Sequence, residues 1–150
     1  MRRTILWTAL ASLAALAAAP AAAQVRSDCG GWQTDARNVF WEDPTRTFAE
    51  GAVRLVALET GEPACCGAHL MVTWPDPDEP FPACAVISAG GDGGGIGFYS
   101  LDLSATEARE DEAKLFLTVA ATATAADGSD PQPRPFAITI DLFAGELSLE

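Results

Sequence analysis

Short runs of alternating or β-branched hydrophobic residues, separated by turn-forming residues, make up most of the chain beyond residue 24. This pattern is typical of half-buried strands, whose successive side chains point to opposite faces of a sheet. We expect strands at Asn38–Trp41, Ala52–Glu59, Ala68–Trp74, Ala83–Ser88, Ile96–Leu103, Leu115–Thr124, Phe136–Phe143 and Glu146–Leu149. Glycine- and proline-rich breakers lie between them, as at 75–82, 90–95 and 127–135. The pattern predicts an all-β fold, an antiparallel β-sandwich or small barrel of about seven to eight strands.

The two strands expected at 115–124 and 136–143 show the clearest alternation. Leu115, Leu117 and Val119 share one parity, and Ile138 and Ile140 share a parity in the second strand. Residues of one parity lie on one face of a strand, so each strand presents an apolar face to a common core.

One segment carries helix signals instead. Ser104-Ala105-Thr106-Glu107 has the capping-box pattern, and Glu110 and Lys114 stand four residues apart. We therefore expect one short helix between the strands at 96–103 and 115–124.

The N-terminus has the pattern of a signal peptide. Arg2 and Arg3 precede an apolar run that ends in small residues, with a cleavage site before Gln24. We expect residues 1–23 to be a signal peptide and 24–150 to be a single β-rich domain, exported to the periplasm or secreted. The apolar run is shorter than the roughly 18 residues typical of a membrane-spanning helix, so we expect no integral membrane segment after cleavage.

The chain is strongly acidic. Its formal net charge of −12 becomes −14 when the two arginines of the signal peptide are removed. Such a surface repels phosphate backbones and anionic lipids, which argues against nucleic-acid binding. The charge also favours solubility, and by itself it names no partner.

Four cysteines, Cys29, Cys65, Cys66 and Cys84, lie in the expected mature chain. An even number in an oxidising compartment favours two disulfides. A direct Cys65–Cys66 bond is the least favourable pairing, because neighbouring Cα atoms lie only about 3.8 Å apart. In an extended segment the two side chains would point to opposite faces and reach Cys29 and Cys84 separately.

The same segment suggests an alternative, a metal site. Cys65, Cys66, His69 and Met71 bring thiolate, imidazole and thioether ligands together, a set that suits copper or zinc. The spacing matches no standard zinc motif, and His69 is the only histidine in the chain. We expect no cofactor unless this site binds copper or zinc.

No motif assigns a catalytic residue. Ser88 follows an apolar strand, but Val86 stands where a nucleophile elbow needs glycine, and nothing in the sequence brings His69 to Ser88. Carboxylates that could form an acid–base pair are plentiful in the expected loops, at Glu42-Asp43, Asp76, Asp78, Glu79 and Asp111-Glu112. Because they are so plentiful, no particular pair stands out.

Aromatic residues and one proline-rich connection are the remaining candidates. We expect most of Trp32, Phe40, Trp41, Trp74, Phe81, Phe98 and Tyr99 to lie in the core, with Trp74 and Phe81 as the first candidates for exposure. They flank the stiff Pro75–Pro80 segment, which would make a contact rim. The leading hypothesis is an exported, non-enzymatic, disulfide-stapled domain that binds a protein or small ligand through its loops. The alternatives are a periplasmic metal-handling protein and a hydrolase with loop carboxylates.

Overall fold

The computed structural model describes residues 23–42, 45–62, 65–124 and 130–150. The strands in this part of the chain are β1 (Val25–Asp28), β2 (Arg46–Phe48), β3 (Val53–Glu59), β4 (Ala68–Trp74), β5 (Ala83–Ser88), β6 (Ser100–Asp111), β7 (Lys114–Ala123), β8 (Gln132–Pro133), β9 (Phe136–Asp141) and β10 (Glu146–Leu149). The helical segments in the same residues are short 3-10 turns, η1 (Trp32–Thr34), η2 (Ala36–Asn38), η3 (Ala49–Gly51) and η4 (Asp92–Gly94). The expected signal peptide lies, except for Ala23, outside these residues.

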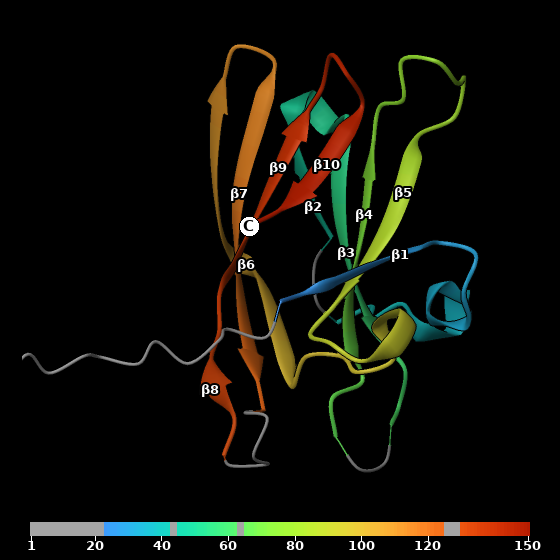
Figure 1. The fold of residues 1–150 in the computed structure, drawn as a ribbon, viewed down its shortest axis with the longest axis vertical. Coiled ribbons are helices and arrows are strands. Elements are labelled where there is room, and N and C mark those ends of the chain that lie inside the picture. Colours follow the sequence, from blue (N-terminus) through green and yellow to red (C-terminus); the bar gives the residue numbers. More distant parts are fainter. Residues whose placement is uncertain (1–22, 43–44, 63–64, 125–129) are drawn as a thin grey trace, which may run out of the picture.

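The strands form two antiparallel sheets that face each other (Figure 1). The first sheet has the order β1-β5-β4-β3-β2, and the second has the order β10-β9-β7-β6, with β8 paired to β7. The predicted all-β sandwich is confirmed. Among the described residues, no helix is long and apolar enough to cross a bilayer.

The core fills the space between the sheets. The first sheet supplies the apolar side chains of one parity from β3, β4 and β5, and the second sheet supplies those of β7 and β9. The alternation predicted for Leu115–Thr124 and Phe136–Phe143 is confirmed, since the side chains of Leu115, Leu117, Ile138 and Ile140 are buried.

The predicted helix near Ser104 is wrong. Residues 100–111 form β6, the longest strand, which pairs with β7 through a bulge between Asp102 and Glu107. The helix signals were local, whereas β7 offers a regular ladder of backbone partners next to the core. Pairing with that ladder overrides the weak local preference. Asp102 accepts hydrogen bonds from the Ser104 hydroxyl and the Ala105 amide at the bulge, which is the local contact that replaces a helix cap.

Two arginines connect the sheets at their edges. Arg26 in β1 donates from Nη1 to the carbonyl of Leu147 in β10, at 2.8 Å. Arg46 in β2 donates from Nη1 to the carbonyls of Leu103 and Ser104 in β6, at 3.0 and 2.7 Å. Each contact joins the edge strand of one sheet to an edge strand of the other, so both open sides of the sandwich are braced.

One half of the outer face of the first sheet is covered by the chain itself. Figure 1 shows the turns η1, η2 and η4 gathered against this sheet, around β1. The strand predicted at Asn38–Trp41 is wrong, because this segment contributes η2 and a single bridge between Val39 and Leu58. The other half of the outer face, near the ends of β3 and β4, has no such cover and leads to the candidate site.

Candidate functional site

The proline-rich connection between β4 and β5 begins beside the turn between β9 and β10. Trp74, the last residue of β4, is 1% exposed and donates from Nε1 to the carbonyl of Gly145 at 2.9 Å. Gly145 lies in the turn between β9 and β10, and a side chain there would collide with Pro77. The start of the connection therefore lies against the turn between β9 and β10, whereas residues 77–82 are exposed.

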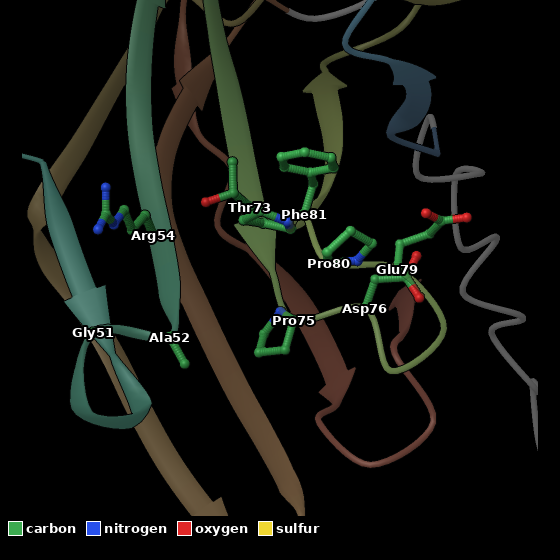
Figure 2. A pocket seen from close by; sticks show the side chains of 10 residues that line it. Gly51, Ala52, Arg54, Thr73, Pro75, Asp76, Glu79, Pro80 and Phe81 are labelled. Carbon is green, nitrogen blue, oxygen red and sulfur yellow. The ribbon is translucent and has the colours of Figure 1, made fainter.

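This connection forms one wall of an open groove of about 540 Å³. Figure 2 shows Arg54 and Thr73 projecting from neighbouring strands, with Phe81 and the prolines on the connection. Arg54 and Thr73 are cross-strand partners, so both side chains lie on the outer face of the first sheet. The full lining consists of Gly51, Ala52, Arg54, Thr73, Pro75, Asp76, Glu79, Pro80, Phe81 and Pro82.

Phe81 is the most prominent apolar side chain of the groove. It is 76% exposed, which confirms it as a candidate for exposure, whereas the same expectation for Trp74 is wrong because that ring is needed in the core. An aromatic ring that is mostly exposed to solvent contributes little burial to folding. Such rings are typical anchors of protein interfaces.

The charges of the groove are mixed. Asp76 and Glu79 lie on the proline-rich connection, and the Asp76 carboxylate accepts the amide hydrogen of Asp78 at 3.0 Å. Arg54 forms no ion pair with another described residue. Neighbouring turns at the same end of the sandwich carry further carboxylates at Glu50, Glu110, Asp111, Glu112, Asp141 and Glu146. Carboxylates outnumber cations at this end, so its field favours a basic partner.

More aromatic rings are exposed than the sequence led us to expect. Among the residues that the structure describes, the exposed rings belong to Trp32, Phe40, Trp41, Phe81, Tyr99 and Phe143. We predicted that most of the seven aromatic residues singled out in the sequence would lie in the core, and this is wrong, because of those seven only Trp74 and Phe98 do. The core is filled by aliphatic side chains together with Trp74, Phe98 and Phe136, so the other rings are not part of it.

The structure brings His69 and Ser88 together, although no sequence pattern linked them. Both side chains are 0% exposed, and His69 Nδ1 and Ser88 Oγ are joined by a hydrogen bond of 2.8 Å. They meet because β4 and β5 pair in antiparallel register with Leu70 opposite Ile87. The edge of the Trp32 ring lies near the imidazole, and a Cβ at Gly94 would lie 2.9 Å from Ser88 Oγ.

This pair is closed to solvent and has the character of a buried structural contact. His69 Nε2 has no hydrogen-bond partner among the residues that the structure describes, so none of these residues orients the ring as the third member of a catalytic triad would. Burial lowers the pKa of His69, against the opposing effect of Glu59 and Glu62, and the imidazole is therefore neutral near pH 7. A substrate cannot reach Ser88 in this conformation.

The sequence left the cysteine pairing open, and the pairing that we judged least favourable is the one in the structure. Cys29 is bonded to Cys84, with Cα atoms 5.8 Å apart, and Cys65 is bonded to its neighbour Cys66, with Cα atoms 3.7 Å apart. The presence of a disulfide is confirmed. Our argument assumed an extended Cys65–Cys66 segment, but β4 begins only at Ala68, and Cys66 has a φ of 73°. Cys29 follows β1, whose register with β5 brings it next to Cys84.

The four residues considered as metal ligands are divided between two environments. Cys65 and Cys66 lie in the loop before β4, where both sulfurs contact Thr124 Oγ1 at 3.2 and 3.1 Å. His69 and Met71 lie on β4, and His69 is engaged with Ser88. A metal site there would require the disulfide to be reduced, since only a thiolate is a strong ligand. Within the described residues, no three His, Cys, Asp or Glu side chains are grouped as metal ligands would be.

The carboxylates with altered pKa values are all stabilised as anions. Hydrogen bonds from Arg37 lower the pKa of Asp35 to about 2, a hydrogen bond from Ser104 lowers that of Asp102, and the amide of Ala144 lowers that of Asp141. A general acid of a glycosidase needs the opposite shift, towards a higher pKa. These three residues therefore do not serve that role.

Sequence reasoning missed Arg54 and Thr73 as groove residues. Their signal was present, because both are polar positions in mostly apolar strands and lie on the face opposite the core residues. No family model, curated protein or solved structure matches this chain. Its function must therefore be argued from its own residues.

Proposed function

We propose that the chain is exported after removal of residues 1–23 and works as a non-enzymatic binding domain. In this proposal, the groove beside Phe81 takes a segment of a protein partner that carries basic residues and an apolar side chain. The observation that carries the proposal is the Phe81 ring, which is 76% exposed and lines the groove beside Arg54 and Thr73. The two disulfides are compatible with an oxidising compartment outside the cytoplasm.

The shape and charge of the groove support a polypeptide partner. An open groove on an uncovered sheet face admits an extended segment, and the Phe81 ring offers it an apolar contact. Asp76 and Glu79 attract basic side chains, while Arg54, which forms no ion pair within the described part of the chain, can bind a carboxylate or a backbone carbonyl of the partner. The acidic surface around the groove adds long-range attraction, which mainly accelerates encounter.

The test is a titration of the ¹⁵N-labelled, oxidised protein with a short synthetic peptide in which two lysines flank a phenylalanine. We expect saturable amide shifts confined to residues 51–54 and 73–82. A peptide with alanine in place of phenylalanine should bind more weakly. Phe81→Ala should weaken binding about tenfold, equivalent to about 1.4 kcal/mol, a typical loss for an aromatic anchor.

Phe143→Ala is the matched control, because Phe143 is an 84% exposed phenylalanine on a neighbouring turn outside the groove. It should leave the affinity unchanged. Shifts that spread over the whole acidic surface without saturation, or equal losses in the two variants, would show charge attraction without a defined site and would overturn the proposal.

A further inference from the structure

A second, smaller cleft opens at the end of the sandwich opposite the proline-rich connection. It has a volume of about 160 Å³ and is lined by Phe40, Ala57, Leu58, Glu59, Ala68, Tyr99, Ser100 and Leu101. These residues come from the end of β3, the start of β4, the start of β6 with Tyr99 before it, and the segment after η2 that carries Phe40. The cleft therefore opens between the two sheets. Leu101 and Ala57 lie on the core-facing sides of their strands, so the floor of the cleft is continuous with the core.

The walls of this cleft are aromatic and aliphatic, with one charged group. Phe40 and Tyr99 are 41% and 56% exposed, yet both backbones are fixed, because the Phe40 amide donates to Ala57 and the Tyr99 amide donates to Thr122. These hydrogen bonds fix the main chain at the rim, where both aromatic side chains line the cleft. The cleft therefore offers aromatic surface to a ligand.

Glu59 gives the cleft its charge. One oxygen of its carboxylate accepts the amide hydrogen of Gly61 at 3.1 Å, and the carboxylate forms no ion pair with another described residue. The lining contains no lysine or arginine. A lining that contains two aromatic residues and a carboxylate without an ion pair among the described residues favours a cation whose surface is partly apolar.

We infer that this cleft binds an alkylammonium group. Its volume is well below the roughly 300 Å³ at which pockets for whole drug-sized ligands begin, so it holds a single group rather than a whole metabolite of that size. An alkylammonium group presents methyl or methylene surface to the rings of Phe40 and Tyr99 and its charge to Glu59. The net charge of the chain, −12, raises the local concentration of such cations.

The experiment is an NMR titration of the ¹⁵N-labelled, oxidised protein with choline at constant ionic strength. The neutral isostere 3,3-dimethylbutanol serves as the uncharged comparison. We expect saturable shifts at Glu59, Tyr99 and Ser100 with choline, and weaker binding of the isostere. Nα-acetyl-lysine methylamide distinguishes the source: tighter binding than choline indicates a lysine side chain of a polypeptide, and weaker binding indicates a small quaternary ammonium compound.

Variants test each wall of the cleft. Phe40→Ala and Tyr99→Ala should each weaken choline binding about two- to fivefold, the range expected for an exposed cation–π contact. Glu59→Gln should weaken choline and leave the isostere unchanged, and Tyr99→Phe should retain binding. Phe143→Ala is the control for a general loss of exposed aromatic surface. Equal affinity for choline and its neutral isostere, or shifts that rise linearly across the acidic surface, would overturn the inference.

Discussion

The two disulfides should contribute very unequally to stability. The Cys29–Cys84 bond closes a loop with a sequence separation of 55, whereas Cys65–Cys66 has a separation of 1. In the chain-entropy model, a loop of the first size lowers the entropy of the unfolded chain by about 14 cal/mol/K, equivalent to about 4 kcal/mol at 25 °C. The same relation gives about 1 kcal/mol or less for adjacent residues, because almost no chain is enclosed.

The assay is urea unfolding of two double variants beside the oxidised parent protein. Cys29→Ala with Cys84→Ala should lose about 4 kcal/mol, a large part of the 5–15 kcal/mol that stabilises a typical domain. With an m-value of about 2 kcal/mol/M, the midpoint should fall by about 2 M. Cys65→Ala with Cys66→Ala should lose little more than the sulfur contacts to Thr124. Equal losses in the two double variants would refute the loop-entropy reasoning.

Two further predictions concern the buried histidine and a tight turn. Burial lowers the pKa of His69 in the folded protein. As the pH falls below about 6.5, the histidine of the unfolded chain therefore takes up a proton before the histidine of the folded chain does. The free energy of unfolding should then decrease between pH 7 and 5.5, by at most about 1.4 kcal/mol per pH unit. His69→Gln should flatten this slope in urea titrations, since the chain has no other histidine; an unchanged slope would contradict the assignment. Glu112 has a φ of 54°, so Glu112→Gly should raise the melting temperature, corresponding to about 0.5–1 kcal/mol, whereas Glu107→Gly within β6 should lower it.

The sequence was informative where alternation and turn residues agreed. The strands expected at Ala68–Trp74, Ala83–Ser88 and Glu146–Leu149 match β4, β5 and β10. Each is an apolar or alternating run bounded by strong breakers, so local pattern and tertiary packing favour the same structure. The short edge strands β1 and β2 were missed, because three or four residues of mixed polarity give no measurable period.

The errors at Ser104 and at the cysteines have a common cause. In both places the prediction rested on neighbouring residues alone, whereas the structure depends on a contact with a distant strand or on the conformation of a loop. The segment with the capping-box pattern pairs with β7 instead of forming a helix. The segment at Cys65, which we assumed to be extended, is a turn in which Cys66 has a positive φ. A pattern of neighbouring residues does not reveal a contact with a distant strand, because that contact depends on the order of strands in the sheet.

The candidate site was accessible to sequence reasoning only in part. The proline-rich connection and Phe81 could be singled out from composition, whereas the opposing wall at Arg54 depends on the register between β3 and β4. The same is true of the His69–Ser88 contact, which depends on the register between β4 and β5. The pairing register of two strands is set by their whole hydrophobic pattern and by the turns that connect them. Residues that meet across strands can therefore be identified only from the assembled sheets.

Site-specific photo-crosslinking in the native cell tests the central claim most directly. Benzoylphenylalanine would replace Phe81 in one strain and Phe143 in another, and the exported protein would be irradiated and analysed by mass spectrometry. The account predicts a discrete polypeptide adduct from position 81, on a chain that begins at residue 24, and none from position 143. No adduct at position 81, or the same adducts from both positions, would contradict a partner-binding groove at Phe81.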